Sequence, residues 1–280
     1  MAEPLEILAA IDDNTRGVFL ETITNPQLEV ADIRAIADIT STKGVPLIVD
    51  NTVTTPYLFR SKDFGVNIEV ISSTKYISGG ATSVGGLIID NGNFDWLQSP
   101  RLEDRARKMG PMALLGALRS EVYRNMGSCL APHHAYLQSL GLETMSLRIE
   151  KSCANALSVA RFLQKHEKVS AVNYPGLENA QHHEIAARQF ANRFGGILTF
   201  DLQSRETCFA LINKLKLIRR ASNVNDNKTL VLHPASTIFC EYPENKLEEM
   251  NIRQTMIRLS VGIEDVLDII HDLEGGLATL

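Results

Sequence analysis

The sequence predicts an α/β protein, with a parallel sheet in its first half and a smaller α+β domain in its second. Two observations carry this prediction. Short, continuously apolar strands alternate with helical stretches over the first 90 residues, which is typical of a parallel sheet covered by helices on both faces. After about residue 95, long helical stretches are followed by a mixture of strands and helices. We therefore expect two domains, at residues 1–145 and 146–280.

In the first half, the spacing of apolar residues predicts helices at 5–13 and 32–42. Continuous apolar runs predict four strands, which we expect to be parallel, at 17–20, 45–49, 68–71 and 86–89.

The second half begins with predicted helical stretches at 109–126 and 135–140 and a long helix at 144–166. Further strands are predicted at 169–172, 196–200 and 256–260. Further helices are predicted at 183–191, 206–215 and 266–273.

Composition excludes several classes of protein. The net charge of −5 comes without a basic stripe, so we expect no nucleic-acid partner. No apolar run reaches the ~20 residues that span a bilayer, and no basic region precedes an apolar stretch at the start, so we expect no membrane association or secretory signal. The cysteines lack close pairs, which argues against a zinc or CxxC site and favours reduced thiols in the cytoplasm: Cys129, Cys153, Cys208 and Cys240. We expect no bound metal.

Polar residues follow three of the predicted strands. Asp50 ends one strand, Lys75 follows the next, and Asn25 follows the first. Taken singly, these are an ordinary helix cap, a solvated surface lysine and a turn residue before proline. Because ligands in open α/β sheets bind beyond the carboxyl ends of the strands, we expect the three to lie at one edge.

A lysine, a carboxylate and nearby hydroxyls match one cofactor in particular. Pyridoxal phosphate needs a lysine for a Schiff base, a carboxylate for its pyridine nitrogen, and donors for its phosphate. Lys75, Asp50 and the hydroxyls of Ser72 and Thr74 supply this set.

Four spaced motifs resemble the Cys/Met-metabolism family of pyridoxal-phosphate enzymes: residues 49–52 (VDNT), 72–76 (SSTKY), 233–237 (HPAST) and 257–265 (IRLSVGIED). The likeness runs from near residue 5 to near 275. It implies a fold-type-I architecture, in which residues 1–145 would be the C-terminal part of the large cofactor-binding domain and 146–280 the small C-terminal domain.

The resemblance also implies roles for the cofactor-binding residues. Lys75 would carry the cofactor as a Schiff base and then move protons. Asp50 would pair with the pyridine nitrogen, and Ser72 and Thr74 would donate to the phosphate.

Three further residues would contact the substrate or lie beside it. Arg258 would bind the substrate α-carboxylate, a task for which its planar fork is suited; without the motif, it would equally suit a surface ion pair. Asn25 would lie near the cofactor's phenolic oxygen or the substrate carboxylate. Thr229 matches a family serine or threonine near the lysine and the substrate.

The implied reaction is a γ-replacement on an activated homoserine, with an amino acid and sulfide or a thiol as substrates, like that of O-acetylhomoserine sulfhydrylase. A methionine or cystathionine γ-lyase is the alternative. Relatives form homo-oligomers, so a dimer or tetramer is implied here.

The resemblance begins inside the large domain, whose earlier strands and phosphate ligands have no counterpart here. We therefore expect a truncated sheet and weak cofactor binding by this chain alone. An inactive fragment, or a subunit that needs a partner carrying the N-terminal half, is a further alternative. A smaller departure is Asn225-Asp226, where relatives often have Gly-Asp.

Overall fold

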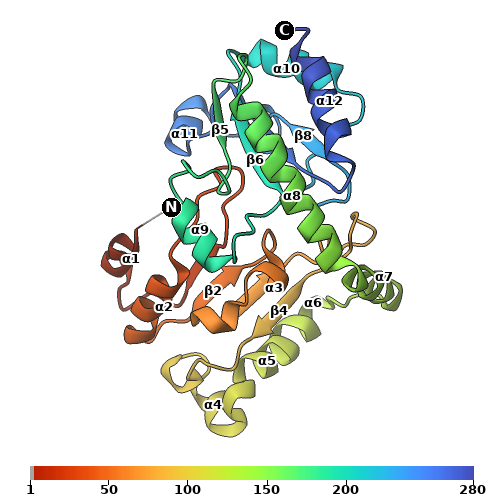
Figure 1. The fold of residues 1–280 in the computed structure, drawn as a ribbon. Helices are drawn as coiled ribbons and strands as arrows, with labels where there is room; N and C mark the ends of the chain where they lie inside the picture. Colours follow the sequence, from red (N-terminus) through yellow and green to blue (C-terminus); the bar gives the residue numbers. More distant parts are fainter. Residues whose placement is uncertain (1–2) are drawn as a thin grey trace.

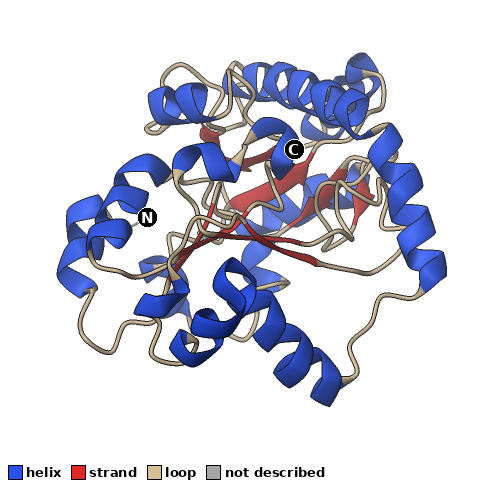
Figure 2. Ribbon diagram, turned by 90° about the horizontal axis from the view of Figure 1, so that it is seen from below, coloured by secondary structure: helices blue, strands red, loops and turns tan. Residues whose placement is uncertain are grey.

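The computed structural model describes residues 3–280 and contains two β-sheets surrounded by helices (Figures 1 and 2). The first sheet has the order β1-β2-β3-β4, formed by Val18–Glu21, Leu47–Asp50, Ile68–Ile71 and Leu87–Asp90. The second has the order β5-β6-β9-β8-β7, formed by Ala171–Asn173, Ile197–Asp201, Met256–Ser260, Leu230–Leu232 and Arg219–Arg220.

Strands β1, β2 and β3 are parallel, as expected, but β4 is antiparallel to β3. The prediction of four parallel strands was therefore wrong for the fourth strand, β4. A parallel return needs a crossover that carries the chain back across the sheet, usually a helix. Residues 72–86 contain turns and no helix, so the chain comes back beside β3 in the opposite direction.

Helices cover the first sheet and lead away from it. Helix α2 begins where the Oδ1 atom of Asp32 accepts a bond from the Ala35 amide (3.2 Å), a capping interaction that satisfies an otherwise free donor. The helices of this half are α1 Pro4–Ala10, α2 Ile33–Thr42, α3 Thr55–Leu58, α4 Glu103–Met109, α5 Ala113–Ala117, α6 Arg124–Met126 and α7 Pro132–Glu143.

Helix α8 (Met145–Gln164) is the longest helix, with 20 residues, and runs from the first half of the molecule to the second (Figure 1). One face is buried and largely apolar, with Ile149, Ala156 and Val159 fully buried. The main core continues without a break from the first sheet to the second. The division into domains at 145/146 stays a prediction.

The second half also contains elements that the sequence pattern did not reveal. Strands β7 and β8 have two and three residues, and helix α11 has six; such short runs give no periodicity to detect. The helices here are α9 His183–Gln189, α10 Arg205–Lys214, α11 Glu244–Glu249 and α12 Val266–Leu277. In the described part of the chain, no helix is long and apolar enough to cross a membrane.

Candidate active site

The parallel strands end in polar residues that lie side by side. Glu21 ends β1 and is the register partner of Asp50, which ends β2. The Thr52 amide donates to Asp50 Oδ1 (2.8 Å), and the Ser72 amide donates to Thr52 Oγ1 (2.8 Å). These bonds fix the turns after β2 and β3 against each other, so Asp50 and Ser72 lie at the same edge of the sheet.

Lys75 lies in the tight turn that follows β3. Its backbone is held at both ends of the turn, by bonds to Ser72 (3.2 Å) and Gly79 (3.1 Å). The side chain is partly buried, and its ε-amine donates to Oδ1 of Asn223. Burial, and then the charge of Arg258, lower the pKa of Lys75, while Asp226 acts in the opposite direction.

Arg258 lies on β9 of the second sheet and is 2% exposed. One guanidinium nitrogen donates to Oδ1 of Asn25 (3.1 Å), and the other donates to the carbonyls of Ser222 and Asn223 (3.1 Å each). Its Nε atom is buried without a partner. All three acceptors are neutral, and burial alone lowers the pKa of Arg258 to about 10. Arg258 is thus a buried cation that has no carboxylate partner among residues 3–280.

Asn25 connects the end of β1 to this arginine. Its amide donates to Oε2 of Glu21 (3.1 Å), and its side-chain oxygen accepts from Arg258. The Asn25-Pro26 peptide bond is cis. The structure therefore brings Asn25, Arg258 and Lys75 into one hydrogen-bonded group, with Asn223 between the last two.

The remaining predicted residues are placed less directly. Thr74 contacts the backbone of Gly85, accepting from its amide (3.0 Å). The Thr229 hydroxyl donates to Glu264 (2.9 Å) and accepts from the Gly262 amide (3.0 Å). Both of its hydrogen-bonding functions are satisfied within the second sheet's half, so a substrate contact from Thr229 stays a prediction.

Three residues of the site were missed by sequence reasoning: Glu21, Asn223 and Asp226. Burial, and then the charge of Asp50, raise the pKa of Glu21. Glu21 could have been found, because it ends a strand next to Asp50, as the argument for Asn25 required. Asp226 matches the aspartate of the Gly-Asp pair of relatives, which is the signal that could have found it. Asn223 carries no local signal, since it lies in the irregular segment between β7 and β8.

Asn225, which stands where relatives often have glycine, has a left-handed backbone with φ 55°. Asparagine tolerates this conformation better than other residues with a side chain. Its side-chain amide donates to the carbonyl of Thr52 (3.3 Å). The asparagine at position 225 therefore adds a hydrogen bond between the segment before β8 and the turn that follows Asp50.

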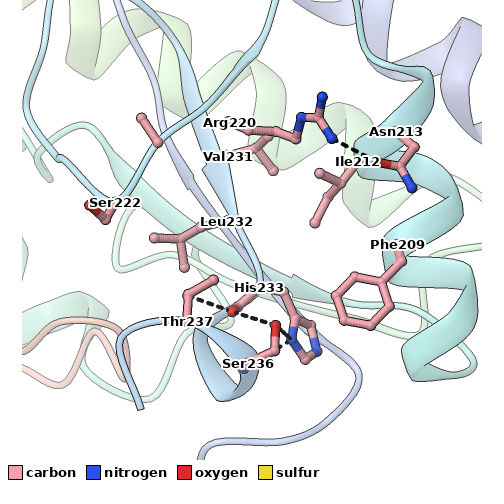
Figure 3. Close-up of a pocket in the computed structure, with 11 residues that line it drawn as sticks. Phe209, Ile212, Asn213, Arg220, Ser222, Val231, Leu232, His233, Ser236 and Thr237 are labelled. Atoms are coloured by element: carbon pink, nitrogen blue, oxygen red, sulfur yellow. Dashed lines mark hydrogen bonds between the residues drawn. The ribbon is translucent and has the colours of Figure 1, made fainter. Parts of the chain in front are cut away.

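A cavity of about 350 Å³ lies between α10 and strands β7 and β8 (Figure 3), and Ser222, whose carbonyl accepts from Arg258, is among its lining residues. None of the predicted site residues lines it. Several of its polar side chains are already paired, Arg220 with Asn213 (2.8 Å) and His233 with Ser236 (2.9 Å). The lining is otherwise largely apolar, so we place the chemistry at the strand ends and not in this cavity.

Comparison with known proteins gives concordant results. Residues 1–278 match the model of the family described as Cys/Met metabolism PLP-dependent enzyme. The chain is 37% identical to the O-acetyl-L-homoserine sulfhydrylase of Corynebacterium glutamicum, covering 99% of this chain and 67% of that protein. It is 39% identical to the L-methionine γ-lyase of Fusobacterium nucleatum, covering 97% of this chain and 64% of that protein.

Among solved structures, the O-acetylhomoserine sulfhydrylase of Wolinella succinogenes is similar with a TM-score of 0.85 and 47% identity. The alignment covers 98% of this chain and 74% of that one. The chain thus spans about two thirds to three quarters of the length of these proteins. Its fold is the α/β, fold-type-I architecture that the motifs implied. Asp50 and Lys75 lie at or just after the ends of parallel strands, Arg258 of β9 lies beside Lys75 through Asn223, and the family match covers nearly the whole chain. We therefore conclude that this protein belongs to the pyridoxal-phosphate-dependent enzyme family of cysteine and methionine metabolism.

Proposed function

We propose that this protein catalyses a γ-replacement on an activated homoserine, with sulfide or a thiol as the second substrate. The observation that carries the proposal is the buried Arg258, which has no carboxylate partner among residues 3–280. It is connected to Lys75 by hydrogen bonds that both side chains donate to Asn223. A buried charge without a counter-ion is costly, and the α-carboxylate of an amino acid would compensate it. The sulfhydrylases of C. glutamicum and W. succinogenes support this choice of reaction.

The residues present fit pyridoxal phosphate. Lys75 would hold it covalently, Asp50 would lie at its pyridine nitrogen, and Ser72 and Thr74 would bind its phosphate. The ε-amine of Lys75 has a neutral partner, the amide of Asn223, and makes no ion pair in the described part of the chain. When bound, pyridoxal phosphate supplies an electron sink for the charge that develops at the substrate Cα.

The protein's own residues would orient the substrate and move protons. Arg258 would bind the α-carboxylate with its guanidinium, whose Nε has no partner among residues 3–280, and Asn25 would keep that guanidinium in place. The lowered pKa of Lys75 increases the neutral fraction of its amine near neutral pH. A neutral amine can accept the Cα proton and return it elsewhere on the substrate.

A γ-lyase is the second candidate, favoured by the 39% identity to the L-methionine γ-lyase of F. nucleatum. The γ-replacement and the γ-elimination would both need Lys75, Asp50 and Arg258. They differ in the fate of the substrate after the γ-group leaves, so the products separate them.

The experiment uses the purified chain with pyridoxal phosphate. We expect homocysteine from O-acetyl-L-homoserine and sulfide. Formation of 2-oxobutanoate and ammonia from methionine, without homocysteine from the first pair, would support the lyase. Borohydride reduction followed by peptide mass spectrometry should place pyridoxyl on Lys75. Lys75→Ala should abolish labelling, whereas Lys151→Ala, which removes an exposed lysine, should not. Absence of both activities and of label in the wild-type chain would refute catalysis by this chain alone and favour the alternative of an inactive fragment or a subunit that needs a partner.

We also propose a homo-oligomer in the cytoplasm. Exposed apolar side chains on the helices between residues 109 and 147, such as Met126 and Leu147, support self-association. The four cysteines are free thiols, which suits a reducing compartment.

A further inference from the structure

Asn223 contacts both of the charged residues on which the proposed chemistry depends. Its side-chain oxygen accepts from the ε-amine of Lys75, and its backbone carbonyl accepts from Arg258 (3.1 Å). Its side-chain nitrogen donates to Oδ2 of Asp226 (3.2 Å). A single amide therefore lies between an amine and a carboxylate.

The partners determine which way this amide faces. An ionised carboxylate only accepts hydrogen bonds, so Asp226 requires the NH2 group of Asn223. The carbonyl oxygen is then left to face Lys75, where an acceptor is needed. Asp226 is 8% exposed, and the Lys228 amide donates to its other oxygen, Oδ1 (3.0 Å). The carboxylate is thus held in place, and it holds the amide in turn.

The amide also keeps two opposite charges apart. The charged groups that act on Lys75 are Arg258, which lowers its pKa, and Asp226, which raises it, while burial lowers it most. Lys228 lies 3.8 Å from Asp226 and offsets part of that negative charge. A carboxylate in direct contact with Lys75 would favour the protonated amine far more strongly than an amide does.

We propose that Asn223 is a positioning residue for Lys75, which aims the ε-amine through a neutral acceptor and separates it from the carboxylate of Asp226. The catalytic meaning of this arrangement rests on the proposed function, because it concerns a lysine that moves protons. The arrangement itself can be tested without turnover.

The test is the pH profile of Lys75 acetylation by acetic anhydride, measured by peptide mass spectrometry on the full chain without cofactor. Asn223→Asp replaces the amide by a carboxylate of nearly the same shape. We expect the midpoint for Lys75 to move up by about one to two pH units, since an adjacent opposite charge favours the charged form. Asn213→Asp, an exposed position that contacts Arg220, is the matched control and should leave the profile unchanged.

A second variant tests the other side of the amide. Asp226→Asn removes the one group that raises the pKa of Lys75, so its midpoint should move down. A profile in Asn223→Asp that coincides with the wild type, or an upward shift in Asp226→Asn, overturns the inference. Thermal melts of each variant establish that it is folded. A wild-type chain without sulfhydrylase or lyase turnover would count against the proposed function alone, because the labelling profile does not depend on it.

Discussion

At the scale of single residues, Arg258 has the most unusual environment. Buried arginines are normally paired with carboxylates. Among residues 3–280, however, the guanidinium of Arg258 has only neutral hydrogen-bond acceptors, and its Nε has no partner. This environment is the basis of the proposal that Arg258 binds the α-carboxylate of the substrate.

Arg258→Lys should weaken binding of the amino-acid substrate more than it slows the chemistry. Lysine keeps the charge but loses the planar fork, and the loss of a charge-assisted bond of ~1.5–3 kcal/mol corresponds to an increase in KM of roughly 10- to 150-fold. Steady-state kinetics with varied O-acetyl-L-homoserine measure KM and kcat separately. Arg188→Lys, which changes an exposed ion pair with Asp32, is the control, and an unchanged KM in Arg258→Lys would contradict the assignment.

Part of this site could be predicted from the sequence, because Asp50, Lys75 and Asn25 each follow a recognisable strand. Strand order and the edge rule for α/β sheets then place them together. Arg258 needed the family motif, since its strand belongs to the other sheet. Asn223 could not be found, because its contact with Lys75 joins residues 148 positions apart and nothing in the local pattern marks it.

At the scale of elements, helix α7 supports the turn that carries Lys75. A Cβ atom on Gly141 would lie 2.0 Å from the carbonyl oxygen of Ile77, in that turn. Arg148 of α8 donates to the carbonyls of both Gly141 (2.6 Å) and Tyr76 (2.7 Å). The close approach of α7 and the two hydrogen bonds from Arg148 hold this turn in place.

Gly141→Ala should therefore destabilise the protein, although alanine is the better helix former. Overpacking against backbone costs about 1–3 kcal/mol. Gly275→Ala is the matched control, since Gly275 lies in α12 with no atom within 4 Å of its added Cβ, and it should gain roughly 0.5–1 kcal/mol. Urea unfolding of both variants measures the difference. A stabilised Gly141→Ala would show that the helix does not press on the turn.

The elements themselves were predictable where apolar periodicity was long enough. Helix α2, strand β3 and helix α8 appear where the sequence indicates them. The direction of β4 was not predictable from its own residues. It depends on the path of residues 72–86, which form turns and no crossover helix.

At the scale of the whole molecule, exposed apolar side chains gather between residues 109 and 147. Met126 is 74% exposed and Leu147 71% exposed. Many such side chains along neighbouring helices are unusual for a monomer and typical of a surface that contacts another protein chain. A second copy of this chain is the partner that the proposed homo-oligomer requires.

Leu147→Glu should shift the assembly toward the monomer, whose mass is 31.0 kDa, because a charge in an apolar interface must be desolvated without a partner. Leu267→Glu provides a control, since Leu267 is 70% exposed but lies on α12, outside the apolar surface between residues 109 and 147 (Figure 1). Light scattering coupled to size-exclusion chromatography gives the mass of each variant. The wild type and Leu267→Glu should elute as a multiple of the monomer mass, and Leu147→Glu as a smaller species. Equal masses for all three chains would place the interface elsewhere, or show that the apolar surface between residues 109 and 147 stays open in solution.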